Sequence, residues 1–246
     1  MKILSYMKYF MPPIISMAYK KYMKHHPFDF MPGLQDAKWI LDVGANKGDV
    51  SEAALKKYPS SKVICFEPVS STYLKLEQKL LKKYPERVFL YKSGLADIAG
   101  TTEINLTNFH GANSIKSQSG FHKALNPHIR EVEKETISLV RLDDIFKDFP
   151  TDHIDIMKID VEGFEKNVID GGMAVISERV DNIIIEASFM RDPNWESQSF
   201  YVISSILYEI GFRLINIYDV HRTNELKDMG IVQMDCIWRH KRLLLA

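Results

Sequence analysis

The stretch Ile40-Leu41-Asp42-Val43-Gly44-Ala45-Asn46-Lys47-Gly48 decides how this chain folds. An apolar strand runs into a turn that carries two glycines, and a helical pattern over residues 50–58 follows. A second apolar strand, Val63 to Phe66, then ends in Glu67, 19 residues after the second glycine. This order of strand, turn, helix and strand is typical of one half of a nucleotide-cofactor site in a doubly wound α/β domain.

The turn also indicates which kind of nucleotide it suits. Gly44 and Gly48 let the backbone approach a ligand closely, and the Glu67 carboxylate can accept hydrogen bonds from both hydroxyls of a ribose. The turn reads Gly-x-Asn-x-Gly, so it lacks the third glycine of the Gly-x-Gly-x-x-Gly turn that surrounds a pyrophosphate. A ribose without a pyrophosphate fits better, which favours S-adenosylmethionine (SAM). A tight turn that binds nothing is the alternative interpretation.

Composition limits the partners of the chain. The 246 residues suffice for one substantial core, and 32 basic residues balance 32 acidic ones to give zero formal net charge. Because this composition provides no basic footprint, we expect no nucleic-acid partner. The two cysteines, Cys65 and Cys236, lie in apolar runs, so buried reduced thiols and a cytoplasmic location are expected.

The first thirty residues differ from the rest of the chain. Five lysines alternate with large apolar residues there, and no acidic residue precedes Asp29. We therefore divide the chain into a basic and apolar extension, residues 1–30, and a main domain, residues 31–246. The extension is expected to pack on the domain or on a second subunit, or else to make a peripheral membrane contact.

Hydrophobic patterns predict an α/β domain beyond residue 31. Strands are expected over 39–43, 63–66, 88–91, 154–159, 183–186, 213–218 and 235–238, and helices over 50–58, 70–84, 165–177 and 196–210. This alternation implies a mostly parallel sheet with helices on both faces. A short strand is expected at 101–106, and the polar stretch 107–127 that follows is interpreted as a binding lid.

A second informative stretch, Lys158-Ile-Asp-Val-Glu-Gly-Phe-Glu165, places alternating charges where a buried strand ends and a helix begins. Ligands of open α/β sheets bind at such strand ends. If this strand neighbours the first one, Asp160 and Glu162 should face the glycine turn. A favourable position at a helix N-terminus is enough to explain Glu165. It does not explain Lys158 and Asp160, for which we favour a functional role.

Together these segments resemble the FkbM-type family of SAM-dependent methyltransferases over about residues 39–186. The string at 158–165 is the most specific match. The other matching elements are Leu41 to Gly48, Phe66-Glu67-Pro68, Gly94-Leu95-Ala96-Asp97, Asn113-Ser114, Arg141 to Asp144 with Arg in place of the usual Thr, Gly171-Gly172 and Glu186.

The resemblance implies a class I methyltransferase fold, which is a seven-stranded sheet, parallel except for its last strand, with SAM above the first two strands. By analogy, Asp42, Gly44 and Asn46 surround the methionine portion, Glu67 takes the ribose and Asp97 meets the adenine amino group. The predicted cofactor site also includes Gly48, Pro68 and Ser114. The family is linked mainly to O-methylation of sugars and natural products, so a small-molecule or glycan acceptor is expected.

Methyl transfer to an alcohol needs a group that takes the hydroxyl proton. The predicted catalytic residues are Asp160, Glu162 and Lys158, and we rank the loop histidines 110, 122 and 128 below the carboxylates. Five acids, at positions 143, 144, 160, 162 and 186, could hold a divalent cation, but hydrogen-bonded carboxylates are the preferred interpretation and no metal is expected. Trp195 could form an aromatic platform for a sugar.

Two other functions compete with an O-methyltransferase. A nicotinamide-dependent oxidoreductase shares the use of Glu67 but requires the missing pyrophosphate turn. A SAM-binding module without catalysis would use the first thirty residues for recruitment to a membrane. The identity of the bound cofactor tests the first alternative, and labelled methyl transfer tests the second.

Overall fold

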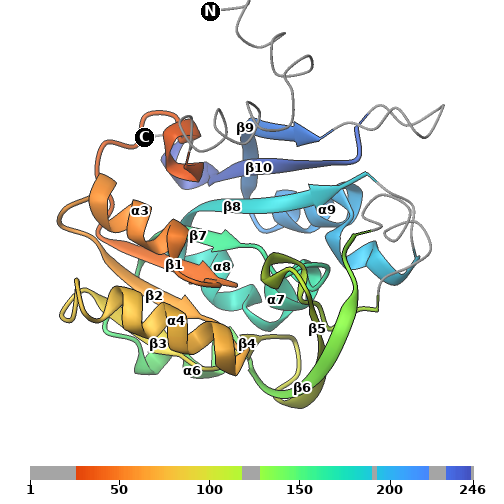
Figure 1. Cartoon of the computed structure of the whole chain (residues 1–246). Coiled ribbons are helices and arrows are strands. Elements are labelled where there is room, and N and C mark those ends of the chain that lie inside the picture. The colour runs from red at the N-terminus through yellow and green to blue at the C-terminus, as the bar shows by residue number, and fades with distance from the viewer. Residues whose placement is uncertain (1–25, 118–127, 190–192, 222–230, 245–246) are drawn as a thin grey trace, which may run out of the picture.

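A seven-stranded sheet runs through the protein in the order β3-β2-β1-β7-β8-β10-β9 (Figure 1). The computed structural model describes residues 26–117, 128–189, 193–221 and 231–244. The strands are β1 (Trp39–Val43), β2 (Lys62–Phe66), β3 (Val88–Tyr91), β7 (Ile154–Ile159), β8 (Val180–Ser188), β9 (Phe212–His221) and β10 (Gln233–His240). Neighbouring strands are parallel except that β10 is antiparallel to β8 and β9. The predicted class I methyltransferase fold is therefore confirmed.

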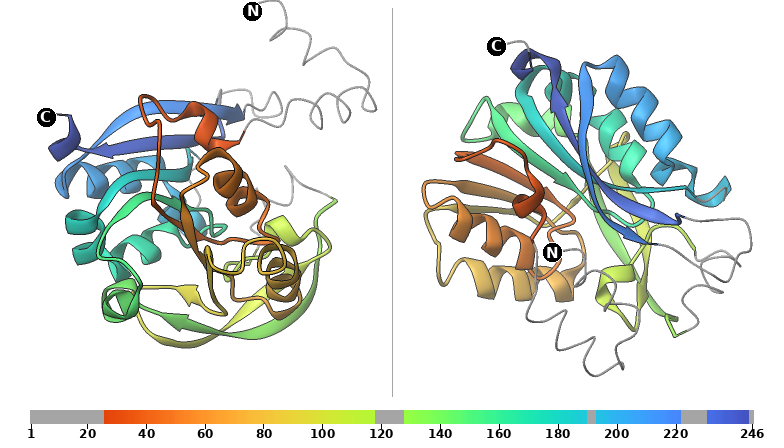
Figure 2. Two further views of the ribbon diagram at one scale, coloured as in Figure 1. Left: turned by 90° about the vertical axis from the view of Figure 1, so that its left-hand side faces the viewer. Right: turned by 90° about the horizontal axis from the view of Figure 1, so that it is seen from above.

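Helices cover both faces of this sheet (Figure 2). On one face lie α3 (Asp49–Lys57) and α4 (Ser70–Leu80), and on the other lie α7 (Glu165–Gly171), α8 (Met173–Arg179) and α9 (Phe200–Glu209). Successive strand residues point to opposite faces, so Ile40 packs with α3 and α4 whereas Leu41 packs with α7 and α8. Shorter helical segments are η1 (Pro27–Phe30), η2 (His110–Ala112), α6 (Leu142–Ile145), η3 (Phe146–Asp148), η4 (Pro193–Gln198) and η5 (Lys241–Leu243).

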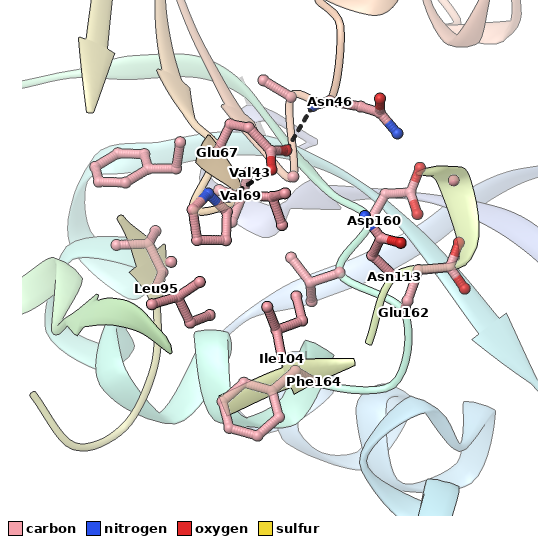
Figure 3. A pocket seen from close by; sticks show the side chains of 18 of the residues that line it. Val43, Asn46, Glu67, Val69, Leu95, Ile104, Asn113, Asp160, Glu162 and Phe164 are labelled. Atoms are coloured by element: carbon pink, nitrogen blue, oxygen red, sulfur yellow. Dashed lines mark hydrogen bonds between the residues drawn. The ribbon is translucent and has the colours of Figure 1, made fainter. Parts of the chain in front are cut away.

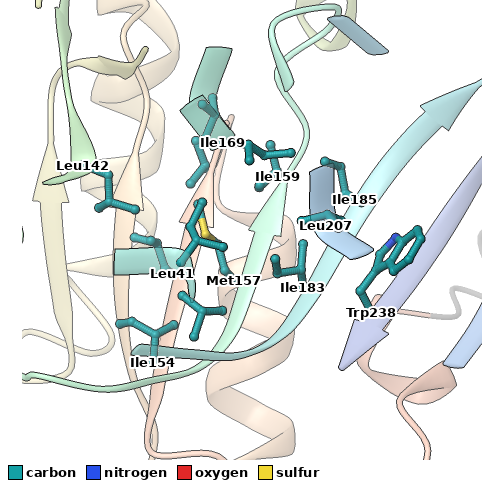
Figure 4. Close-up of a cluster of buried hydrophobic side chains, with 14 of the residues drawn as sticks. Leu41, Leu142, Ile154, Met157, Ile159, Ile169, Ile183, Ile185, Leu207 and Trp238 are labelled. Carbon is teal, nitrogen blue, oxygen red and sulfur yellow. The ribbon is translucent and has the colours of Figure 1, made fainter. Parts of the chain in front are cut away.

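The central strands are apolar because both of their faces are covered. In β7, Met157 and Ile159 point into the cluster that Figure 4 shows, together with Leu41 of β1 and Ile183 of β8. Parallel strands in such a position normally read as continuous hydrophobic runs. Cys65 and Cys236 are buried free thiols on opposite faces of the large sheet, as predicted.

A second sheet, in the order β4-β6-β5, stands beside the carboxyl ends of the large sheet. Its strands are β4 (Gly94–Leu95), β5 (Gly100–Thr107) and β6 (Glu131–Val140). The prediction of a strand at 101–106 is confirmed by β5, whereas β6 was not predicted. Most residues in the first half of β6 are exposed on both sides of the strand, and Glu and Lys are poor strand formers.

Two predicted helices are interrupted. The helix expected over 165–177 divides into α7 and α8 at Gly171-Gly172. A Cβ atom at Gly171 would lie 1.9 Å from the carbonyl oxygen of Ala96, so only glycine lets α7 pack this closely on the small sheet. The helix expected over 196–210 begins as η4, and α9 starts after Ser199.

The described chain begins with η1, which belongs to the core. Phe28 is only 1% exposed and meets Tyr58 edge-on, and Phe30 stacks on Tyr218 at 4.4 Å between ring centroids. Residues 26–30 therefore pack with the domain that follows them. Residues 1–25, on which the predicted amphipathic extension mostly falls, lie outside the described part. Among the helices of the described residues, none has the length and apolar character needed to cross a membrane.

The packing of η1 leads to a testable prediction. We expect Phe28→Ala to lower the free energy of unfolding by about 3–5 kcal/mol, because it leaves a cavity in a closed core. Removal of residues 1–25 should leave SAM affinity unchanged, because the described residues that line the cavity at the carboxyl ends of β1, β2 and β7 lie between 43 and 164. Urea denaturation and calorimetry measure the two effects. If Phe28→Ala costs no more than Leu74→Ala at an exposed position, η1 does not contribute to the core.

Candidate active site

A cavity of about 450 Å³ opens at the carboxyl ends of β1, β2 and β7, between these strands and the small sheet (Figure 3). Cavities of this size bind small molecules and cofactors. Its lining comes from the turn after β1, the end of β2, β4, the inner face of β5 and β6, the loop after β5 and the segment after β7. The site therefore lies where sequence analysis placed it, at the switch point of the sheet.

The glycine turn is packed tightly against the end of β7. The N–H groups of Gly44 and Ala45 both donate to the carbonyl of Phe66, at 3.0 and 2.9 Å. Gly44 has a φ of 78°, and a Cβ atom there would lie 1.9 Å from the backbone oxygen of Asp160. Glycine is therefore required at position 44, and the turn faces Asp160 as expected from the pairing of β1 with β7.

Glu67 is held rigidly in the cavity wall. Its Oε2 accepts a hydrogen bond from the N–H of Asn46 at 2.9 Å, and its Oε1 accepts one from the N–H of Val69 at 3.0 Å. Burial raises the pKa of Glu67 to about 7, although these two hydrogen bonds act against the rise. Each carboxylate oxygen keeps further acceptor capacity. Glu67 thus presents further acceptor capacity at the cavity wall, and its contact with a ribose stays a prediction.

The cavity next to Glu67 is apolar. Val69, Leu95, Ile104 and Phe164 lie together on this side (Figure 3). An apolar compartment beside a fixed carboxylate fits the flat base and the ribose of an adenosine, and the glycine turn provides close backbone approach for the rest. The residues present therefore fit SAM.

Four of the predicted cofactor residues lie behind the cavity surface rather than on it. Gly44, Asn46, Glu67 and Pro68 line the cavity, whereas Asp42, Gly48, Asp97 and Ser114 are not among its described lining residues. Asp42 accepts a hydrogen bond from Ser51 Oγ at 2.5 Å, and Asp97 accepts one from Asn167 Nδ2 at 2.9 Å. Gly48 packs on the helix α4 that follows β2. Direct contact of all eight residues with the cofactor stays a prediction.

Lys158 joins two carboxylates at the base of the site. Its Nζ lies 3.1 Å from Oδ2 of Asp160 and 3.6 Å from Oδ1 of Asp42. Burial alone would lower the pKa of Lys158, but Asp160 and Asp42 outweigh it and raise the pKa. Asp42 is buried, whereas the side chain of Asp160 is 42% exposed and lines the cavity. Lys158 therefore orients Asp160 at the cavity surface.

Three carboxylates meet beside the glycine turn. Oxygens of Asp160, Glu162 and Glu186 all lie within 4.8 Å of one another. Burial, and then the charge of Asp160, raises the pKa values of Glu162 and Glu186 well above the ordinary range. Gln198 Nε2 donates to Glu186 at 2.7 Å. Such a group shares protons or holds a cation, because separate negative charges at this spacing repel strongly.

The set of five acids considered for a cation is thus divided. Asp160, Glu162 and Glu186 come together, but Asp143 and Asp144 do not join them. Asp143 accepts hydrogen bonds from the N–H groups of Val175 and Ala174, at 3.0 and 3.3 Å, and so caps the start of α8. Asp144 pairs with Arg141 on the surface.

The turn at Glu162 is held from two sides. Glu162 has a φ of 53°, a conformation that costs a residue with a side chain about 1–3 kcal/mol. Ser114 Oγ donates to the carbonyl of Glu162 at 2.6 Å, and the carboxylate of Glu165 accepts from the N–H groups of Val161 and Gly163. Ser114 and Glu165 therefore act on the site through the backbone that carries Glu162.

Sequence analysis missed the apolar side chains that line the cavity, among them Val69, Ile104 and the large residue Phe109. The described part of the polar stretch 107–127 does line the cavity, at Asn108, Phe109, Gly111 and Asn113. An aromatic residue within a polar loop was the available signal. His122 lies outside the described residues, as do the side chains of His110 and Trp195, and His128 is exposed outside the cavity lining.

Comparison with known proteins identifies the family. Residues 42–214 match the model of the methyltransferase FkbM domain. The chain belongs to the FkbM methyltransferase family. This FkbM-family protein is therefore an enzyme that uses SAM, which confirms the predicted family, enzyme class and cofactor. The oxidoreductase and the non-catalytic module are both replaced by this identification.

Several relatives of this FkbM-family methyltransferase share moderate identity with it. Methyltransferase sdnD of Sordaria araneosa is 28% identical, over 79% of this chain and 80% of that protein. The 2-O-methyltransferase NoeI of Sinorhizobium fredii is 25% identical, over 56% of this chain and 59% of that protein. Among solved structures, methyltransferase FkbM of Methylobacillus flagellatus is 16% identical with a TM-score of 0.48, and the match covers 82% of this chain and 44% of that one.

The pKa of Glu67 predicts how cofactor affinity depends on pH. Below about pH 7 this carboxyl is protonated and loses acceptor capacity, so SAM affinity should fall as the pH decreases below that value and level off above it. Glu67→Gln should remove this dependence, and Glu67→Ala should weaken binding by about 1.5–3 kcal/mol. Calorimetry between about pH 5.5 and about pH 8.5 measures both effects. An equal slope in the wild type and the Gln variant would assign the titration to another group.

Proposed function

We propose that this methyltransferase transfers the methyl group of SAM to a hydroxyl of a sugar, a glycan or another small natural product. The observation that carries the proposal is the carboxylate group of Asp160, Glu162 and Glu186, which meets the cofactor cavity beside the glycine turn. A hydroxyl acceptor is the kind that needs such a group, because its proton must be removed as the oxygen is methylated.

The residues of the site have two tasks in this reaction, to bind the substrates and to remove the proton of the acceptor hydroxyl. Bound SAM supplies an activated methyl group, and the protein must hold the acceptor oxygen in line with it. Asp160 accepts the hydrogen bond of the acceptor hydroxyl and takes its proton. Lys158, whose Nζ lies 3.1 Å from Oδ2 of Asp160, fixes the position of this side chain. Glu162 and Glu186 lie close enough to Asp160 to share the proton afterwards.

Other observations support parts of this proposal. One relative, NoeI, is named a 2-O-methyltransferase, which agrees with an oxygen acceptor. Zero formal net charge supports a small-molecule acceptor rather than a nucleic acid. The buried free cysteines support a cytoplasmic location. The lysines and apolar residues of positions 1–30 support a peripheral membrane contact, which binding to anionic vesicles with and without residues 1–25 would test.

The deciding experiment uses SAM labelled on its methyl group. The protein is incubated with a panel of sugars, glycosides and phenolic natural products, and the products are analysed by mass spectrometry with and without EDTA. We expect an O-methylated product in both conditions. A product methylated on nitrogen or carbon, or no product from any hydroxyl, would contradict the proposal. Loss of activity in EDTA would instead show that the reaction needs a metal ion, for which Asp160, Glu162 and Glu186 are the ligand group nearest the cavity.

A further inference from the structure

Phe109 is an exposed aromatic residue at the edge of the cavity. Its side chain is 61% exposed, although it belongs to the cavity lining. Large aromatic rings that stay in water beside a binding cavity commonly form part of a ligand contact, because burying them on binding is favourable. The proposed methyl transfer assigns no role to this ring.

The loop that carries Phe109 is firmly fixed. Thr107 Oγ1 donates to the carbonyl of Phe109 at 2.6 Å and accepts from its N–H at 3.2 Å. The N–H of Thr107 donates to Oδ1 of Asn113 at 2.8 Å, and the N–H of Asn108 donates to the carbonyl of Arg130 at 3.0 Å. These bonds close the loop at both ends, so its backbone presents Phe109 at a set position.

Gly111 leaves room for the ring itself. A Cβ atom at Gly111 would lie 2.9 Å from Cε1 of Phe109, which is closer than real contacts allow. The backbone of Gly111 has no positive φ, so alanine could adopt its conformation. The glycine thus serves the position of the neighbouring ring, and Gly111→Ala offers a way to displace the ring without removing it.

The loop that carries Phe109 also brings Asn113 to the cavity lining. Asn113 lies beside Asp160 and Glu162, and the apolar side chain of Leu95 lies across the cavity from them (Figure 3). The loop after β5 therefore adds an aromatic ring to a part of the cavity that already holds an amide and two carboxyl groups. A pyranose matches this combination, because it has an apolar face of C–H groups and a rim of hydroxyls.

We propose that Phe109 is a specificity-determining residue that stacks on the C–H face of a sugar acceptor and so presents a sugar hydroxyl to Asp160. This inference rests on the proposed function and narrows its acceptor to a sugar. Glu67 and the glycine turn, which are predicted to hold the cofactor, come from other segments of the lining, so Phe109 should contribute to acceptor binding and leave SAM binding unchanged.

The test measures glycoside binding and turnover in a set of variants. Saturation-transfer NMR detects methyl glycosides of glucose, galactose, mannose and rhamnose on the protein loaded with S-adenosylhomocysteine. Phe109→Ala and Phe109→Leu should weaken glycoside binding about tenfold and raise the KM for the glycoside by a similar factor. The kcat should stay within about threefold of the wild-type value, and SAM affinity should not change. Phe109→Tyr should stay within about twofold of the wild type, because it keeps the ring.

Two further variants control the result. Gly111→Ala should lower the affinity for the glycoside, as Phe109→Ala does. Tyr201→Ala removes an aromatic side chain that is 65% exposed and does not line the cavity, and it should change nothing. Equal affinity in Phe109→Leu and the wild type would overturn stacking as the role of the ring.

The outcomes separate this inference from the proposed function. Methyl transfer to a hydroxyl other than that of a sugar, with no glycoside bound, would overturn the role of Phe109 and leave O-methylation standing. Glycosides that bind through Phe109 but receive no methyl group would support the stacking contact and contradict the proposed reaction.

Discussion

Replacing Asp160 with asparagine is expected to lower turnover by about 10²-fold or more while SAM affinity stays nearly intact. The substitution keeps the shape of the side chain but removes the negative charge that takes the proton from the acceptor hydroxyl. The ion pair with Lys158, at 3.1 Å, is lost as well, so the replaced side chain is also less firmly oriented. Calorimetry with SAM and product mass spectrometry on the same preparation measure the two quantities.

A surface aspartate provides the matched control for this variant. Asp144 is largely exposed and pairs with Arg141 outside the cavity, so Asp144→Asn should keep turnover within about twofold of the wild type. If Asp160→Asn instead loses SAM affinity in step with turnover, Asp160 belongs to the cofactor site and another group removes the proton.

Replacing Lys158 with methionine is expected to lower the free energy of unfolding by about 3–5 kcal/mol. The lysine is buried, and its removal leaves the carboxylate of Asp42 inside the protein with Ser51 as its remaining described partner. A buried charge without a counter-ion is costly. Turnover should fall too, because Asp160 loses the contact that positions it. Urea denaturation and the labelled-SAM assay measure these effects.

A double variant tests the cause of this destabilisation. Adding Asp42→Asn to Lys158→Met removes the unpaired charge, so part of the lost stability should return. Lys166→Met breaks the more exposed pair with Asp170 and should cost less than about 1 kcal/mol. A cost for Lys158→Met as small as that for Lys166→Met would show that the buried pair contributes little to stability.

The large sheet could be predicted from sequence because its strands carry strong local signals. The strands β1 and β7 are apolar runs that end in glycine or charged residues. Short continuous apolar runs of this kind are typical of parallel strands that are buried on both faces. The strand β6 carried no such signal, because the exposed Glu131 and Glu133 precede the buried Ile137 and Leu139. Its existence depends on pairing with β5, a tertiary contact that no local pattern records.

The candidate site was predictable to the same extent. Glu67 follows β2 and Asp160 follows β7, the two strands that flank β1, so their positions on either side of the glycine turn follow from strand order alone. The contact of Gln198 with Glu186 and the position of Phe109 depend on how loops fold back over the sheet. Asp143 entered the alternative cation set because a helix cap and a cation ligand use the same residue type, and its hydrogen bonds at the start of α8 agree with the preferred interpretation.

The small sheet also bears on how this enzyme could acquire a new substrate. The small sheet and the described part of the loop after β5 supply Phe109 and Asn113, whereas the glycine turn, Glu67 and Asp160 follow strands of the large sheet. Exchange of the segment that carries the small sheet between related enzymes should therefore alter acceptor choice and leave the methyl-donor chemistry in place. Ser114 Oγ donates a hydrogen bond to the carbonyl of Glu162 and so connects the loop after β5 with the turn after β7. Such a chimera has to preserve this hydrogen bond.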